Sequence, residues 1–308
     1  MKHLNYKLLE VDGIPVLKIR YYKVQNSLKG IVVLVHGVSH GAWCWINIVD
    51  LLTQNGYACF AINLRGHGDN NRKDIKGAHL SDYITDVIRS ITYIENNCAK
   101  PEINIPYSKP FIIGHSMGGA IVESYISDFS HKVKGAVLFA PATAEGLGLG
   151  RIFTTSSSLR GLRTAPTTLF GIKISLACSN FFAVKNGIRC KSKISKEDLT
   201  YCAESLCRES LKAMLGLRHF ELKNNLTIPV FVIGSDKDAY FPVKSLNQTA
   251  AYYGTKAMIL KGLCHDMMFD KDGWKDSAEA VLEFLKEPDA LKNKPVEFVA
   301  SLESKFLS

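Results

Sequence analysis

The sequence of 308 residues predicts an α/β fold, in which helices flank a mostly parallel central sheet and one inserted cap interrupts the core. Short apolar or β-branched runs alternate with longer amphipathic stretches, which is typical of βαβ units. The alternation stops after Pro141 and resumes at Ile228, which indicates an insertion. With 46% hydrophobic and 22% charged residues, the composition is that of a globular chain with ample material for a core.

The alternation also places the individual elements. Strands are predicted at 16–22, 31–35, 58–62, 111–113, 135–139, 230–233 and 257–260. Helices are predicted near 42–54, 80–96, 117–128, 243–253 and 274–286. The α/β core is therefore expected at 1–142 and 227–290, the cap at 143–226 and a peripheral, polar C-terminal tail at 291–308.

The net charge of +9 lies in the predicted cap. Between Gly146 and Lys196 there is no Asp or Glu, and the cations are Arg151, Arg160, Arg163, Lys173, Lys185, Arg189, Lys191, Lys193 and Lys196. Apolar residues lie among these cations, which suits contact with an amphiphilic acyl compound or an anionic lipid surface. The alternative is that the apolar groups pack on the core while the cations stay in solvent. Nucleic acid is not expected as a partner, because no recognised module or aromatic-interleaved groove accompanies the charge.

Cysteine usage and the N-terminus predict a cytoplasmic protein. The eight cysteines are scattered without a CxxC pair, which favours reduced thiols, although Cys190, Cys202 and Cys207 could form one bridge in an exported chain. The first ten residues lack the features of a secretory signal. No apolar run approaches the ~18 residues that a membrane span needs.

The strongest local motif is Gly114-His115-Ser116-Met117-Gly118, which follows an apolar run and opens a helical pattern. In this GxSxG elbow the glycines permit a strained strand-to-helix turn that lifts the serine hydroxyl to the carboxyl end of the sheet. Ser116 is therefore the candidate nucleophile, and this chemistry needs neither a metal nor an organic cofactor.

A serine nucleophile requires a histidine that takes its proton and an acid that orients the histidine. Of the histidines after Ser116, His131 follows too closely and His219 lies in the insertion. His265, on the loop after the last predicted strand, is the candidate base.

Two acids, Asp236 and Asp238, both follow the strand predicted at 230–233 by a few residues. Their position alone does not decide between them, so both remain candidates.

Together these motifs resemble the α/β-hydrolase superfamily of serine hydrolases, over about 30–286 apart from the insertion. The resemblance also rests on His36-Gly37 and on Leu64-Arg65-Gly66-His67-Gly68. It implies an oxyanion hole made by the backbone N–H groups of Val38 and Met117. It further implies that His36 holds its loop and that the segment after Leu64 is a structural turn.

The same resemblance favours Asp238 as the acid, because it precedes Pro242 by four residues, the usual spacing in this fold.

Some narrower families of this fold are disfavoured because the sequence departs from their motifs. The segment from His36 to Trp45 is similar to the start of plant methylesterases and hydroxynitrile lyases, but the lyases carry threonine at Gly37 and lysine at Asp266. Epoxide hydrolases and haloalkane dehalogenases of this fold use an aspartate nucleophile, so both they and the lyases are disfavoured.

The expected function is a serine hydrolase that cleaves a small-molecule carboxylic ester through an acyl-enzyme intermediate. The broad arrangement is similar to that of esterases, monoacylglycerol lipases and lysophospholipases, which implies a lipid-like or amphiphilic substrate. Acyl transfer, thioester hydrolysis and C–C bond hydrolysis remain alternatives on the same residues. A ligand-binding receptor is the alternative from another class.

Overall fold

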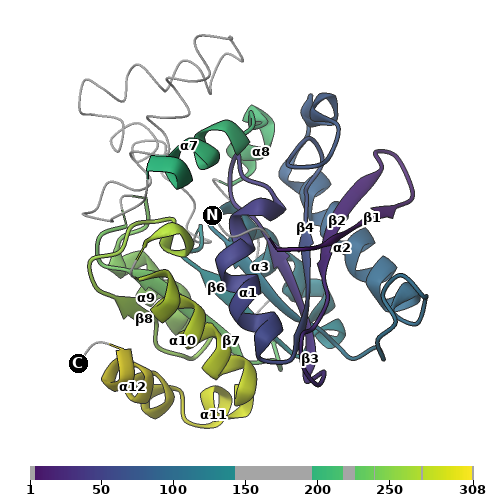
Figure 1. The fold of residues 1–308 in the computed structure, drawn as a ribbon. Helices are drawn as coiled ribbons and strands as arrows, with labels where there is room; N and C mark the ends of the chain where they lie inside the picture. Colours follow the sequence, from purple (N-terminus) through teal and green to yellow (C-terminus); the bar gives the residue numbers. More distant parts are fainter. Residues whose placement is uncertain (1–3, 143–195, 218–225, 239, 272, 307–308) are drawn as a thin grey trace, which may run out of the picture.

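The computed structural model describes residues 4–142, 196–217, 226–238, 240–271 and 273–306 (Figure 1). Its centre is an eight-stranded sheet with the order β1-β2-β4-β3-β5-β6-β7-β8. The strands are β1 (Lys7–Val11), β2 (Leu17–Tyr22), β3 (Gly30–Val35), β4 (Tyr57–Ile62), β5 (Phe111–His115), β6 (Gly135–Phe139), β7 (Val230–Ser235) and β8 (Met258–Leu260).

Strands β3 to β8 pair in parallel, whereas β1 and β2 form an antiparallel edge next to β4. The parallel strands are apolar along almost their whole length because both faces of the sheet are covered. In β3 every residue is buried. Its side chains alternate between the two faces, so that Val32 and Leu34 join one core cluster while Ile31, Val33 and Val35 join the other.

Helices cover both faces, as Figure 1 shows. One face carries buried residues of α1 (Ile46–Gln54), α10 (Trp274–Lys286), α11 (Pro288–Asn293) and α12 (Pro295–Phe306). The other carries α2 (Leu80–Asn97), α3 (Met117–Phe129), α8 (Leu211–Gly216) and α9 (Val243–Tyr252). Helix α7 (Lys196–Ser205) and short 3₁₀ helices at Ala42–Trp45, Arg72–Ile75, Ser130–Lys132 and Met267–Phe269 complete the described elements.

The predicted fold class is confirmed: helices flank a mostly parallel sheet. Strand β1 was not predicted, because its lysine and glutamate leave only an edge pattern with two buried residues. The expectation of a peripheral tail at 291–308 needs correction. Helix α12 in this region buries Phe298, Val299 and Leu302 against the core. These side chains recur at helical spacing, so the polar residues between them face outward.

Much of the expected cap lies outside the described residues, including its basic segment up to Lys193. Its described part contains α7 and α8, which Figure 1 shows beyond one end of the sheet. Cys202 and Cys207 are both buried and in the reduced, thiol form, as are Cys44, Cys59, Cys98 and Cys264. Within the described ranges, no helix is long and apolar enough to cross a bilayer.

The buried carboxyl group of Glu123 leads to a prediction about how the free energy of unfolding depends on pH. Glu123 of α3 accepts a hydrogen bond from the Tyr253 hydroxyl at 3.1 Å, and burial raises its pKa to about 8 although that hydrogen bond lowers it. The ordinary pKa is 4.5, so between these values the folded state holds a proton that the unfolded state has lost. Stability therefore falls as the pH rises through this window, by up to about 1.4 kcal/mol per unit.

We expect Glu123→Gln to abolish this dependence. The variant should melt at a higher temperature than the wild type at about pH 9, and the gain should shrink towards about pH 5, as followed by calorimetry. Glu102→Gln, at an exposed position, is the control and should change little at either pH. A difference between Glu123→Gln and wild type that stays constant with pH would contradict the assigned titration.

Candidate active site

The candidate residues lie on loops that follow neighbouring parallel strands. Ser116 follows β5, Val38 follows β3, Asp238 follows β7 and His265 follows β8. Because the carboxyl ends of parallel strands meet at one edge of the sheet, these loops converge there. Four separate segments of the chain therefore contribute to one site.

Ser116 occupies a strained turn between β5 and α3. Its φ of 54° and ψ of −119° lie in a region that a residue with a side chain rarely adopts. Such a conformation costs roughly 1–3 kcal/mol and persists only where its surroundings enforce it. The Ser116 N–H donates to the Phe139 carbonyl at 3.2 Å, and its own carbonyl accepts from Gly119 N–H at 2.8 Å. The side chain of Ser116 is thus held at the strand end, where it is 8% exposed.

The glycines of the elbow permit close contact between backbones. A Cβ atom on Gly114 would overlap the Gly118 carbonyl oxygen, and one on Gly118 would overlap the carbonyl oxygens of Val35 and His36. The start of α3 therefore packs directly against the end of β3, which only glycine allows. This packing places the elbow beside the loop that carries Val38.

His265 and Asp238 form a hydrogen-bonded pair. The Nδ1–H of His265 donates to Asp238 Oδ2 at 2.8 Å, and the two side chains are 7% and 0% exposed respectively. The other oxygen of Asp238 accepts from the backbone N–H groups of Tyr240 at 2.7 Å and Phe241 at 3.0 Å. Because an ionised carboxylate is only an acceptor, this pairing fixes the proton of His265 on Nδ1.

Asp236, the other candidate acid, has a different contact. Its Oδ1 accepts from the Gly262 N–H at 2.7 Å, and its Oδ2 lies 3.5 Å from the ammonium of Lys237. Asp236 therefore supports the loop between β8 and His265 from an exposed position. The structure brings Asp238 to the histidine and directs Asp236 to this loop.

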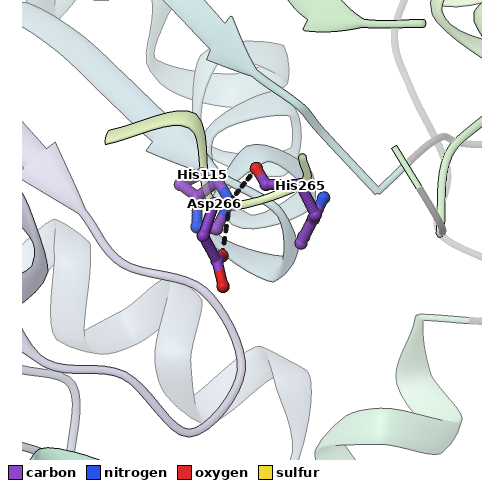
Figure 2. Close-up of side chains that lie close together, drawn as sticks. All are labelled: His115, His265 and Asp266. Carbon is purple, nitrogen blue, oxygen red and sulfur yellow. Dashed lines mark hydrogen bonds and ion pairs between the residues drawn. The ribbon is translucent and has the colours of Figure 1, made fainter. Parts of the chain in front are cut away.

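His115 links the elbow to the histidine loop, as Figure 2 shows. Its ring centroid lies 4.7 Å from that of His265, and its Nε2–H donates to the His265 carbonyl at 3.3 Å. Asp266 Oδ1 lies 3.5 Å from the same nitrogen. Burial, with a contribution from His265, lowers the pKa of His115 well below its ordinary value. A neutral His115 thus connects the residue before the serine to the backbone of the candidate base.

His115, His265 and Asp266 also form a group that could in principle hold a metal, since one ligand atom of each lies within 4.8 Å of the others. A zinc ion needs ligand distances near 2.0–2.1 Å and unprotonated imidazole nitrogens. Here Nε2 of His115 donates its proton to a carbonyl and Nδ1 of His265 donates to Asp238. One nitrogen of each of the two histidines is therefore engaged with a protein acceptor.

The loop after β3 lies directly against the elbow. A Cβ atom on Gly37 would be 2.9 Å from the Cβ of Ser116, so Val38 follows the point of closest contact. His36 is buried, with Nδ1–H directed at the Gly37 carbonyl (2.8 Å) and Nε2 accepting from the Leu64 N–H (3.2 Å). Both nitrogens serve the backbone, so His36 holds this loop as the sequence indicated.

Met117 begins α3, immediately after Ser116. The Met117 and Val38 N–H groups thus belong to the residue after the serine and to the loop packed on it. Both positions suit donors that would face a substrate oxygen near the serine.

Aromatic side chains pack together around His40, next to the site. The rings of His40, Trp43 and Phe269 stack, with centroids 5.4 Å apart for His40 and Trp43 and 5.6 Å apart for Trp43 and Phe269. Tyr201 of α7 meets Trp43 edge to face at 5.9 Å. A residue of the expected cap therefore packs on an aromatic cluster of the core.

Two residues beside the site, His40 and Glu209, were not singled out from the sequence. His40 donates from Nδ1 to the Val38 carbonyl at 2.7 Å, and its Nε2 lies 3.7 Å from Asp266. Glu209 of the expected cap accepts a hydrogen bond from the N–H of Ser39, the next residue of the same loop. No local motif marks Glu209, since its partners Ser39, His67 and Tyr83 are distant in the chain.

The comparisons with known proteins agree with this geometry. Residues 26–272 match the model of the family described as Hydrolase_4, serine aminopeptidase, S33. The chain is 34% identical to a putative chloroplastic methylesterase 11 from Arabidopsis thaliana, over 36% of this chain and 26% of that protein. It is 25% identical to a monoacylglycerol lipase from Mycolicibacterium smegmatis, over 78% of this chain and 82% of that protein.

Among solved structures, an esterase from Exiguobacterium antarcticum superposes with a TM-score of 0.68 at 15% identity, covering 90% of this chain and 98% of the esterase. At this identity the likeness concerns the fold. The aligned regions span 26%, 37% and 39% of the length of the first curated relatives.

The second prediction concerns the close contact of Gly118 with the backbone at the end of β3. Gly118→Ala should lower the free energy of unfolding by about 3 kcal/mol or more, because the new methyl group meets two fixed carbonyl oxygens. Chemical denaturation measures this loss. Gly30→Ala is the matched control, since its Cβ would lie 3.4 Å from the Tyr57 ring, an ordinary contact, and it should cost less than about 1 kcal/mol. Equal effects of the two substitutions would disprove the role of the close approach.

Proposed function

We propose that this chain, which belongs to the serine aminopeptidase S33 family of α/β hydrolases, hydrolyses carboxylic esters with Ser116 as nucleophile. The observation that carries the proposal is the hydrogen bond from His265 to the buried Asp238 beside the strained turn of Ser116. A histidine oriented in this way is the base that a serine hydroxyl needs.

The reaction follows from these positions. The Oγ of Ser116 attacks the acyl carbonyl while His265 takes the hydroxyl proton, and Asp238 stabilises the resulting imidazolium. The N–H groups of Val38 and Met117 hold the negative oxygen. His265 then gives its proton to the departing alcohol, which leaves an acyl group on Ser116. Water, deprotonated by His265, releases the carboxylic acid and restores the serine.

An ester substrate fits the site better than a peptide N-terminus. An aminopeptidase must bind the ammonium group of its substrate, and a carboxylate of the enzyme that has no other cationic partner would do so. The described carboxylates near the site face histidines instead: Asp238 faces His265, and Asp266 lies near His115 and His40. The curated relatives named above, a methylesterase and a monoacylglycerol lipase, carry names of ester-cleaving enzymes.

The substrate that we propose is amphiphilic. The exposed Tyr201 of α7, which packs edge to face on the buried Trp43, offers an apolar surface for an acyl or alcohol group. The segment between Gly146 and Lys196, with nine cations and no acids, would attract an anionic head group or lipid surface. We include residues 143–226 in a cap on these grounds. The reduced thiols Cys202 and Cys207 favour the cytoplasm as the location.

The third prediction tests the nucleophile. Purified protein should hydrolyse p-nitrophenyl esters, and Ser116→Ala should reduce turnover at least about 10⁴-fold, because no other group supplies the attacking oxygen. Ser124→Ala is the control, since this serine lies on the same helix and donates only to the Ala120 carbonyl. Turnover that survives Ser116→Ala would remove Ser116 from the mechanism.

The same assay, run from acetate to palmitate, tests the substrate class. Preference for longer chains and activation by anionic vesicles over zwitterionic ones are expected for an amphiphilic substrate. A sharp optimum at acetate with no response to vesicles would rule out the lipid-like substrate while leaving the esterase proposal intact.

The fourth prediction compares the two acids. Asp238→Asn should lower kcat by about 10⁴-fold, because an amide cannot stabilise the imidazolium or hold the required tautomer. Asp236→Asn should cost less than about tenfold, since its carboxylate supports only the Gly262 loop. Steady-state kinetics of both variants measure the difference. An equal or greater loss at Asp236 would reverse the assignment.

A further inference from the structure

Glu209 is a buried carboxylate outside the residues that the mechanism uses. It lies between α7 and α8 in the expected cap, and its side chain is 1% exposed. Oε1 accepts from the Tyr83 hydroxyl at 2.6 Å and from the Ser210 N–H at 2.8 Å. Oε2 accepts from the Ser39 N–H at 3.1 Å and from His67 Nε2 at 3.1 Å. Both oxygens are therefore fully used.

The hydrogen bonds of His67 require that this histidine carries a charge. Its Nδ1 faces the Arg65 carbonyl at 2.9 Å while its Nε2 faces Glu209, so both nitrogens meet acceptors. A neutral imidazole has only one N–H group and would leave one of these contacts without a proton. Burial disfavours the charge, but Cys207 and Glu209 together raise the pKa of His67 well above its ordinary value. Glu209 and His67 thus form a buried ion pair.

This ion pair is attached to the loop that carries Val38. Ser39 has a φ of 62°, and the cap segment binds it from both sides. Its N–H donates to Glu209, while its carbonyl accepts from the Cys207 N–H at 2.9 Å. His67 belongs to the turn after β4, and its ring lies 5.0 Å from that of His36 beneath the same loop. One cap segment therefore fixes the backbone next to Val38 against the core.

We propose that Glu209 is a positioning residue: through Ser39 and His67 it holds the loop of residues 37–40 so that the Val38 N–H faces the substrate oxygen. The inference rests on the proposed ester hydrolysis and extends it, because it makes the oxyanion-binding loop depend on the cap. A buried carboxylate is costly to desolvate unless every lone pair is used, and here the four donors come from four separate parts of the chain. An anchor for the cap alone would need no bond to Ser39.

The decisive variant is Glu209→Gln. An amide offers one oxygen where the carboxylate offers two, so its NH₂ group must oppose either the Ser39 and His67 donors or the Tyr83 and Ser210 donors. It also leaves the charge of His67 without a partner. If the proposal is correct, kcat for the preferred p-nitrophenyl ester falls about 10- to 100-fold while KM changes little, since a displaced donor affects the transition state more than ground-state binding.

Hydrogen exchange followed by mass spectrometry supplies a readout that does not depend on catalysis. Peptides that cover residues 36–41 should exchange faster in Glu209→Gln than in wild type, whereas peptides from the buried strand β7 should not change. Glu204→Gln, at an exposed position of α7 in the same segment, is the matched control and should alter neither exchange nor kinetics. Tyr83→Phe is the second variant, because it removes one donor but keeps the ion pair; a smaller loss of the same kind is expected, even if Glu209→Gln fails to fold.

The outcomes separate the two proposals. Faster loop exchange together with a loss confined to kcat supports the positioning role. Faster exchange at residues 36–41 without a change in kcat overturns this role. Unchanged exchange at residues 36–41 also overturns it, whatever the value of kcat. If the wild type hydrolyses no ester of the series, the proposed function fails. Faster exchange at residues 36–41 in Glu209→Gln would then still show that Glu209 stabilises this loop. Unchanged exchange would contradict that stabilisation as well.

Discussion

Close contact between backbones at the carboxyl edge of the sheet is the constraint on which the site depends. The start of α3 lies so near the end of β3 that a side chain at Gly118 would overlap two carbonyl oxygens of that strand end. Gly37 then approaches Ser116, which brings the loop with Val38 to the serine. The strained φ of Ser116 persists because this packing leaves the turn no other path. The placement of Ser116 beside the start of the Val38 loop therefore follows from close backbone packing at this edge of the sheet.

Burial and hydrogen bonding give the buried histidines His36, His67 and His115 different protonation states. Burial lowers the pKa values of His36 and His115 well below the ordinary value, and their hydrogen bonds to backbone groups suit neutral rings. His67 is the opposite case, because a buried carboxylate and a carbonyl both accept from it. His265 faces Asp238, so the proton on its Nδ1 is fixed. Similar rings thus differ in their charge and in the partners of their nitrogens.

The sequence predicts those parts of the molecule that are encoded locally. The elbow at Ser116 and the parallel strands follow from short motifs and apolar runs, and the order of the loops follows from the fold. Position in the sequence does not separate Asp236 from Asp238, because two residues in one loop differ only in how the loop turns. In the structure, Asp238 is held by two backbone N–H groups and meets His265.

Other features depend on contacts between distant residues and were missed for that reason. Glu209 meets Ser39 and His67 across more than a hundred residues, and no spacing rule connects them. The C-terminal helix α12 appears polar in sequence because only one face, with Phe298 and Val299, is buried against the sheet. A sequence pattern reports which residues are apolar, whereas the partner of a buried polar group is set by the tertiary fold.

The central claim, that one activated serine lies at this edge of the sheet, is tested most directly by covalent labelling. A fluorophosphonate reacts with a serine hydroxyl only where a base and oxyanion donors activate it. After reaction with the folded protein, peptide mass spectrometry should find the phosphonyl group on Ser116 alone, and His265→Ala should prevent the labelling. Modification of a different residue, or equal labelling of the His265→Ala protein, would contradict the account.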